Sequence, residues 1–205
     1  MRRTILILSA TALVLSACST PTTNGTPTVG SGASSTSPAQ SAGLPPDAPR
    51  VEHPIEVTRF KQDPCSTLTK IQVEELLGPN PETVPRPDGS AGPACRWSFP
   101  ATLNPRVDVI FSDFGDSGTA KYYAAKGTTY QLLEPLAPID GYPVTAYGIK
   151  DNRANGDCSV VLGTSDTQTI SIALMQSDAN VGKKDPCDAA REGAIRVLAT
   201  IRGGN

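Results

Sequence analysis

Four cysteines, Cys65, Cys95, Cys158 and Cys187, are the residues whose chemistry the sequence indicates most directly. Zinc sites and redox centres favour the short C-x-x-C spacing, which this sequence lacks. We therefore expect no metal site. An even number of cysteines is typical of exported domains with disulfides, so we expect two bridges. Of the three pairings, Cys65–Cys95 with Cys158–Cys187 is preferred, and the two others stay open.

The fifth cysteine, Cys18, lies in a setting that favours acylation of its thiol. It follows Leu15-Ser16-Ala17, at the end of an apolar run that begins at Ile5 behind two arginines. The run is too short to span a bilayer as a helix, so it predicts a cleavable leader over residues 1–17. We expect Cys18 to become the first residue of the mature chain and to hold it to the membrane through acyl chains.

His53 is the only histidine, and it stands beside Pro54 in a segment without predicted structure. A catalytic histidine must be held rigidly against its nucleophile. We therefore expect His53 to be incidental and assign no catalytic residue to the chain.

Four loop aspartates are candidates for acid–base chemistry: Asp113, Asp116, Asp151 and Asp157. The paired carboxylates of a glycosidase are brought together by the fold, so the sequence leaves this role open as an alternative. Solvated loop aspartates are the commoner case. The segment 151–156 resembles a calcium loop only superficially, because Arg153 stands where a ligand is needed. It predicts a hairpin turn.

Aromatic residues supply the remaining candidates for binding. Trp97, two positions after Cys95, is expected to pack against a disulfide in the core. Tyrosine has an apolar ring and a polar tip and is common in ligand pockets. Four tyrosines could line one if the fold brings them together: Tyr122, Tyr123, Tyr142 and Tyr147.

Composition divides the chain into three parts. Residues 18–56 are rich in Ser, Thr, Pro, Gly and Ala, and predict a lipidated, disordered linker. Residues 57–205 are expected to form one globular domain. The chain has 18 basic and 20 acidic residues, and loss of the leader's two arginines leaves a net charge of about −4. A mildly acidic chain without basic clusters is not expected to bind nucleic acid.

Local signals predict three helices in the folded part. Thr69 and Gln72 form a capping box for a helix that ends at Gly78. A second helix is expected over residues 117–127. The last begins at Asp185, with Pro186 in its first turn. Its apolar stripe consists of Ala190, Ala194, Val197, Leu198 and Ile201.

Alternating or short apolar runs predict strands over residues 95–99, 106–114, 130–136, 142–149, 158–164 and 169–176. Asp140-Gly141 and Asn155-Gly156 mark turns between the later runs and favour antiparallel hairpins. The sequence therefore predicts an α+β domain. Its antiparallel sheet has about five to six strands, with N-terminal, middle and C-terminal helices packed on it.

Several short motifs occur in an order that is similar to a known family. They are Asp63-Pro64-Cys65, the run 74–78 (EELLG), Cys95-Arg96-Trp97, Gly141-Tyr142-Pro143, Cys158 and Asp185-Pro186-Cys187. Over residues 61–201 the chain resembles actinobacterial lipoproteins with a four-cysteine domain of unknown function, a group that includes Lpr-type lipoproteins of mycobacteria. The resemblance implies a lipid-anchored, disulfide-bonded domain of the cell envelope. It supplies no catalytic residues to carry over, and we expect no cofactor.

These observations favour a non-enzymatic module that binds or senses an envelope ligand or protein partner on the outer face of the cell membrane. A carboxylate-dependent envelope hydrolase is one alternative, and a structural or assembly role is another. The sequence does not identify the ligand. A concave patch rich in tyrosine and aliphatic residues would support the binding role. An exposed apolar patch larger than a few hundred Å² would support an assembly role.

Overall fold

The computed structural model describes residues 45–100, 102–112 and 115–203. Its helical elements are α1 (Thr58–Gln62), η1 (Pro64–Thr67), α2 (Lys70–Leu77), α3 (Ala120–Ala124), η2 (Arg153–Asn155) and α4 (Pro186–Ile201). Its strands are β1 (Glu82–Arg86), β2 (Ala94–Phe99), β3 (Thr102–Phe111), β4 (Leu132–Ile139), β5 (Tyr142–Gly148), β6 (Asp157–Gly163) and β7 (Thr169–Met175). The expected leader, the lipidated Cys18 and the linker as far as residue 44 lie outside the described residues.

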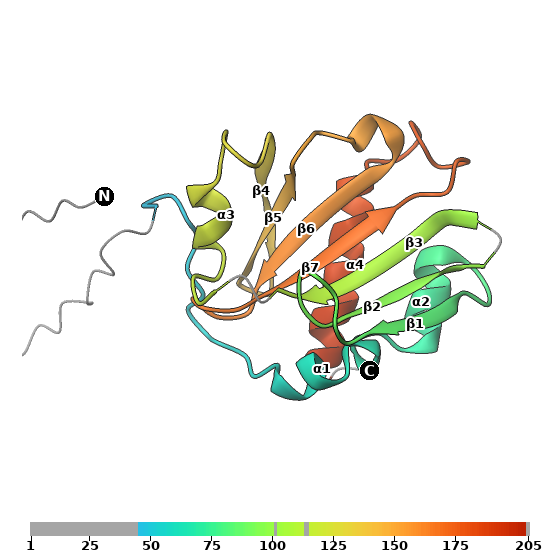
Figure 1. Cartoon of the computed structure of the whole chain (residues 1–205), viewed down its shortest axis with the longest axis horizontal. Helices are drawn as coiled ribbons and strands as arrows, with labels where there is room; N and C mark the ends of the chain where they lie inside the picture. Colours follow the sequence, from blue (N-terminus) through green and yellow to red (C-terminus); the bar gives the residue numbers. More distant parts are fainter. Residues whose placement is uncertain (1–44, 101, 113–114, 204–205) are drawn as a thin grey trace, which may run out of the picture. The chain divides into compact units, whose positions relative to one another are not determined.

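All seven strands form one antiparallel sheet in the order β1-β2-β3-β7-β6-β5-β4. Each half is a meander, β1 to β3 and β4 to β7, and the two halves meet where β3 pairs with β7. Figure 1 shows α4 running behind the sheet and α3 lying beside β4 and β5. The two halves are joined in sequence through α3, which lies between β3 and β4.

The predicted α+β class, the antiparallel sheet and the three main helices are confirmed. The sheet has seven strands and not five to six, because β1 also pairs with β2. All five residues of β1 are exposed, and Pro85 interrupts it, so this strand lacks the apolar alternation by which strands are recognised. Short α1 was also not predicted.

The helix boundaries follow the local signals closely. The Thr69 side chain accepts a hydrogen bond from the backbone of Gln72, and the Gln72 side chain bonds back to the Thr69 backbone. The Asp185 side chain caps α4 in the same way through the backbone N–H of Cys187. The helix expected over residues 117–127 is shorter, since Gly118 and Gly127 both adopt positive φ. At Gly118 a side chain would collide with the backbone of Asp166.

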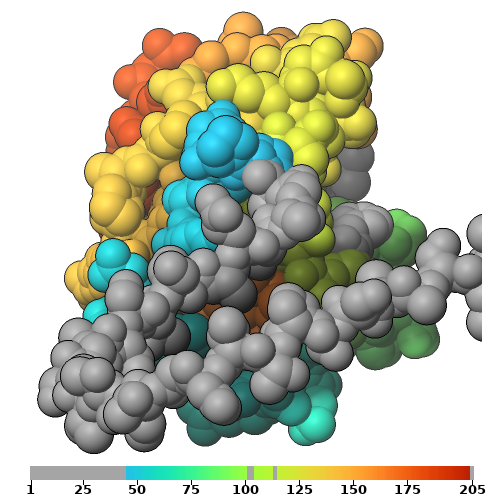
Figure 2. Space-filling view, turned by 90° about the vertical axis from the view of Figure 1, so that its left-hand side faces the viewer, coloured from blue at the N-terminus to red at the C-terminus, as the bar shows by residue number. Residues whose placement is uncertain are grey.

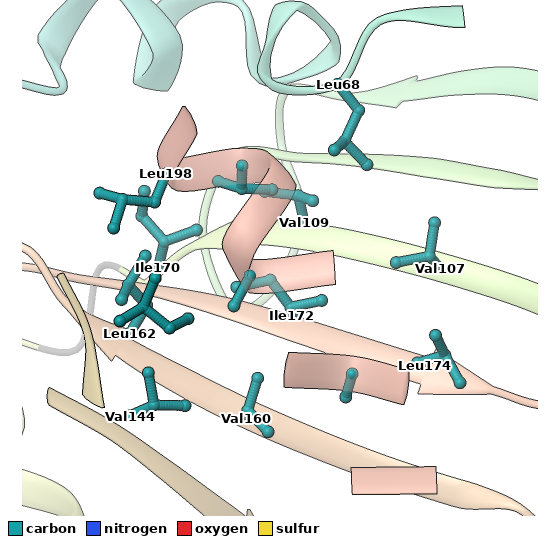
Figure 3. Packing of buried hydrophobic residues seen from close by; sticks show 14 of the residues in the cluster. Leu68, Val107, Val109, Val144, Val160, Leu162, Ile170, Ile172, Leu174 and Leu198 are labelled. Atoms are coloured by element: carbon teal, nitrogen blue, oxygen red, sulfur yellow. The ribbon is translucent and has the colours of Figure 1, made fainter. Parts of the chain in front are cut away.

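The main core lies between α4 and the sheet. Figure 3 shows valine, leucine and isoleucine side chains of β3, β5, β6 and β7 gathered beside α4. The apolar stripe predicted for α4 is entirely buried in this cluster. Helix and sheet approach closely, because a Cβ on Gly193 would lie 3.1 Å from Cγ2 of Ile172. Close packing of buried apolar side chains is the main favourable contribution to the free energy of folding.

Two disulfides tie the helical turns to the sheet. Cys65 of η1 is bonded to Cys95 of β2, and Cys158 of β6 is bonded to Cys187 of α4. This is the pairing preferred from the sequence. Trp97 is buried in the same apolar cluster as Cys95, as its position in the sequence predicts.

The segment 45–56, which the sequence assigned to the linker, packs against the folded domain, and Figure 2 shows its blue to cyan residues lying on the surface of the domain. Val51 is buried, and its backbone N–H donates to Asp166. The backbone N–H of Ile55 donates to Thr164, and the Thr119 hydroxyl donates to the carbonyl of Pro49. The folded part therefore begins before residue 57. The composition did not indicate this, because a segment held by a few hydrogen bonds and one buried side chain needs few apolar residues. We call residues 45–56 the strap.

Candidate functional site

The sheet face turned away from α4 carries a different set of residues from the core face. The strand register places one row of side chains across this face, from β4 to β1: Leu133, Tyr147, Ser159, Ala173, Asp108, Arg96 and Val84. We call this surface the tyrosine face. Short α3 covers its β4–β6 end, where Tyr122 and Tyr123 pack on Leu133 and Val161.

Three tyrosine rings meet on this face. The rings of Tyr122 and Tyr130 stack with centroids 5.5 Å apart and planes 26° from parallel. The ring of Tyr147 stands edge-on to both, with its centroid 4.7 Å from that of Tyr122 and 5.5 Å from that of Tyr130. Such offset and edge-on contacts are the favoured geometries of aromatic pairs. The residues come from α3, the loop after it and β5, so only the fold brings them together.

Hydroxyl groups join the rings to the sheet beneath them. Tyr147 donates a hydrogen bond of 3.0 Å to Oγ of Ser171 on β7. The hydroxyls of Tyr122 and Ser112 lie 3.2 and 3.4 Å from the same oxygen. On β5, two strands away, the hydroxyl of Thr145 lies 3.2 Å from that of Tyr123. These bonds fix the ring orientations, because each buried phenol would otherwise lack a partner.

Burial raises the pKa of two of these phenols, Tyr147 and Tyr130. Desolvation, assisted by the neighbouring Tyr122, raises the pKa of Tyr147 far above its ordinary value. The same two causes, in the same order, raise the pKa of Tyr130. At neutral pH both hydroxyls therefore donate and accept hydrogen bonds without carrying charge.

A hollow of about 500 Å³ opens beside Tyr130 and Tyr147. It lies where β5 ends and the chain crosses toward β6, and its volume falls in the usual range for small-molecule sites. Side chains that line it include Tyr130, Tyr147, Ile149, Lys150, Asn152 and Asp157. We call this hollow the tyrosine pocket. Its lining combines aromatic rings, one exposed aliphatic side chain, an amide and two opposite charges.

An ion-pair network holds the loop that forms one wall of the tyrosine pocket. Two guanidinium nitrogens of Arg153 donate to Asp151 at 2.9 and 2.6 Å, and a third donates to Glu134 of β4 at 3.1 Å. The left-handed Gly156 then leads into β6, as the predicted turn requires. The wall is thus tied to the edge strand β4 through Arg153 and Glu134.

The two carboxyls that flank this loop have opposite environments. Hydrogen bonds from the Arg153 side chain and backbone lower the pKa of Asp151. Burial raises the pKa of Asp157, against the opposing effects of Arg106 and a hydrogen bond with Asn152. Asp157 lines the tyrosine pocket, whereas Asp151 does not. The fold therefore separates two carboxyls that looked equivalent in the sequence.

Further along the tyrosine face, toward β1, charged residues replace the aromatic ones. Nε of Arg96 donates to Asp108 at 2.6 Å, and Nε of Arg106 lies 3.7 Å from the other oxygen of the same carboxylate. Asp108 is buried beneath these two side chains. The half of the face nearest β4 is aromatic and the other half is ionic.

The remaining sequence candidates are dispersed. His53 and Asp116 are exposed, and Asp113 lies outside the described residues. Tyr142 packs against the main core and not with the other tyrosines. Among the described residues, no group of three or more His, Cys, Asp or Glu side chains is placed to hold a metal ion. In the same residues, no helix combines the length and the apolar character that crossing a membrane requires.

Of the four tyrosines that the sequence offered as pocket residues, the structure brings Tyr122, Tyr123 and Tyr147 into one cluster, and only Tyr147 lines the tyrosine pocket. Sequence reasoning missed Tyr130 and Ser171. In the expected strand 169–176, Ser171 looked like any other polar or small residue between apolar ones. Nothing near it in the sequence indicates that tyrosines cover it. One local signal did indicate the face on which the tyrosines gather. Thr145 and Tyr147 are two positions apart, so both lie on the same side of β5.

Comparison with known proteins gives one match. A family model described as a protein of unknown function, DUF3558, covers residues 13–200. No curated protein and no solved structure shows a significant match to the chain. The matched range includes the whole of the sheet, both disulfides and the tyrosine pocket.

Proposed function

The chain belongs to the DUF3558 family of proteins of unknown function, and we propose that it is a lipid-anchored module that binds a small ligand in the tyrosine pocket. One observation carries this proposal: Tyr130 and Tyr147 meet at a hollow of about 500 Å³ beside a half-buried carboxyl. Aromatic walls with a few oriented polar groups are the usual composition of small-molecule sites.

The free-energy cost of burying the Asp157 carboxyl supports a binding role. An apolar residue in place of Asp157 would avoid the desolvation that raises the pKa of this carboxyl. Two further polar side chains, Lys150 and Asn152, face the same hollow. Polar groups that weaken a fold and converge on a concave surface are typical of functional sites. A surface with only a structural role does not need them.

The setting of the protein is also a proposal. The Leu15-Ser16-Ala17-Cys18 motif supports an acyl anchor on Cys18, and the order of the cysteine motifs supports kinship with actinobacterial Lpr-type lipoproteins. On this proposal the domain lies on the outer face of the cell membrane, where its disulfides are stable. Intact mass of the protein from its native membrane tests it. A chain that begins at Cys18 and carries acyl mass is expected, and an unprocessed chain would contradict it.

The binding role is tested with the full chain in detergent. The protein is incubated with a small-molecule extract of bacterial envelope and examined by native mass spectrometry. We expect a bound species that is lost in Tyr130→Ala and retained in Tyr142→Ala. Tyr142 is a matched control, because it is a partly buried tyrosine on the opposite, core side of the sheet. Equal binding by both variants would overturn the proposed site.

A carboxylate-dependent hydrolase is the second candidate, and the opposite pKa shifts of Asp151 and Asp157 favour it. A general acid requires a carboxyl with a raised pKa, and a general base requires a carboxyl with a lowered pKa. Against it, Asp151 is held by Arg153 and does not line the tyrosine pocket. Turnover of an envelope polymer that Asp157→Asn abolishes would establish this role in place of simple binding.

An assembly role has less support. The large apolar side chains exposed among the described residues are Ile71, Val84 and Ile149, which lie on α2, on β1 and after β5. Single exposed apolar residues on separate elements are common on protein surfaces and do not form a docking patch.

A further inference from the structure

The ring of Tyr130 has one face that no other ring of the cluster covers. Its inner face stacks on Tyr122. Tyr147 lies at 5.5 Å from Tyr130 but also at 4.7 Å from Tyr122, so it stands at the side of the stacked pair. A ring on the outer face of Tyr130 would be about twice as far from Tyr122 as from Tyr130. Tyr130 lines the tyrosine pocket, so a ligand bound there can stack on this outer face.

The charged side chains of the tyrosine pocket balance one another. Lys150 and Asp157 line the same hollow, so the lining has no net charge and does not attract a cation or an anion in preference to a neutral ligand. A wholly apolar ligand is disfavoured, because it would strip water from Asp157 and Asn152 without replacing their hydrogen bonds. The lining therefore favours a neutral ligand that has an apolar face and many hydrogen-bonding groups.

The polar groups suit hydroxyls in particular. Asp157 accepts hydrogen bonds, Lys150 donates them, and Asn152 does both. A hydroxyl can donate to one such group and accept from another, so adjacent hydroxyls on a ring satisfy a mixed set of this kind. Asn152 lies close enough to Asp157 to oppose the rise in the pKa of its carboxyl, so a ligand can contact both groups.

Resting on the proposed function, we infer that the ligand of the tyrosine pocket is a neutral saccharide whose C–H face stacks on the outer face of Tyr130 while its hydroxyls bond to Asp157, Asn152 and Lys150. A sugar ring has the apolar face and the dense hydroxyls that this lining requires. A volume of about 500 Å³ leaves room for more than one sugar residue.

The test uses the full chain in detergent micelles and an array of immobilised neutral and N-acetylated oligosaccharides. Each bound saccharide is then titrated in soluble form by calorimetry. Loss of the aromatic platform in Tyr130→Leu is expected to weaken binding about tenfold. Tyr130→Phe keeps the ring and should change affinity by less than about threefold. Tyr142→Leu is the control that leaves binding unchanged.

Salt and Asp157 provide a second readout. Binding of a neutral saccharide should change less than about twofold between roughly 0.05 and 0.5 M NaCl, because no ligand charge is screened. Asp157→Asn keeps the planar shape but loses an acceptor of strong hydrogen bonds, so we expect about tenfold weaker binding.

Free amino acids and phosphate esters are titrated as comparators. If only these charged compounds bind, with a strong salt dependence and a need for Tyr130, the saccharide inference fails while the proposed function survives. If saccharides bind equally well to Tyr130→Leu and Asp157→Asn, the assignment to this pocket fails. If neither saccharides, comparators nor the envelope extract gives binding that depends on Tyr130, both the inference and the proposed function fail.

Discussion

On the face of the sheet that α4 covers, successive inward residues of β7 are Ile170, Ile172 and Leu174, all buried. On the opposite face of the same strand, Ser171 lies within hydrogen-bond distance of the hydroxyls of Tyr122 and Tyr147, and Ala173 is partly exposed. The first face is closed by aliphatic contacts and two disulfides. The second is held by hydrogen bonds and ion pairs and opens into the tyrosine pocket.

This difference suggests a division of work between the two faces. Apolar burial and covalent links supply stability on the α4 side. The tyrosine side can then carry groups that are costly to bury, such as Asp157, without loss of the fold. A substitution on the α4 face should therefore change stability, whereas one on the tyrosine face should mainly change binding. Variants on each of the two faces test this expected difference.

Removal of a disulfide should have the largest effect on stability. Cys158 and Cys187 are 29 residues apart, and Cys65 and Cys95 are 30 apart. Loop closure of this length is worth about 3.5 kcal/mol in the unfolded chain. We expect each double variant to alanine to lose about that much in urea unfolding. A loss below about 1 kcal/mol in the variant without Cys158 and Cys187 would mean that α4 does not need its covalent link to the sheet.

Truncation of the core should come next. Ile172→Ala removes a fully buried side chain that faces Gly193 of α4, and is expected to cost about 3 kcal/mol. The matched control is Ala173→Ser, one residue away on the tyrosine face, which should cost less than about 0.5 kcal/mol. Equal losses in urea unfolding would remove the contrast between the faces.

Loss of a single hydroxyl on the tyrosine face should have a smaller effect. Tyr147→Phe removes the donor to Ser171 and should cost about 1 kcal/mol. Because burial raises the pKa of Tyr147, the folded chain should hold this proton above pH 10. Stability should then fall as pH rises past the ordinary tyrosine pKa, where only the unfolded chain ionises. Absorbance of tyrosinate during alkaline titration measures this, and Tyr147→Phe should lose the late-titrating phenol.

The smallest expected effect is a gain in stability. Burial raises the pKa of Asp157 in the folded state. The stability linked to its proton is therefore complete at low pH and is lost as pH rises through the folded pKa. Asp157→Asn should slightly raise the melting temperature at pH 7 and leave it unchanged near pH 3. A lower melting temperature at pH 7 would show that the carboxylate stabilises the fold, and would weaken its assignment to a binding site.

Much of the secondary structure could be predicted because its signals are local. The capping box at Thr69, the cap and proline at Asp185-Pro186, and the glycine turns at 141 and 156 each act through backbone hydrogen bonds a few residues long. Strand β1 could not be found, since exposed edge residues leave no apolar pattern. The strap 45–56 was missed for a similar reason.

The candidate site was only partly predictable. Alternation assigned Tyr147 to one side of β5, yet it does not say which strand lies next to β5 or what covers that side. Tyr130 follows a short helix whose placement depends on the crossing between the two meanders. Asp157 looked like any loop aspartate until the fold half-buried it at the end of β6.

Signals from neighbours along the chain were enough to predict the α+β class, the ends of α2, the start of α4, the turns and the apolar side of the predicted strands. The tertiary structure selected the preferred disulfide pairing from three possibilities, and it alone shows that β7 pairs with β3 and that Tyr122, Tyr130 and Tyr147 meet near Asp157. The physical reason is that the pairing of distant strands is selected by the burial of the whole core, and no short stretch of residues encodes it.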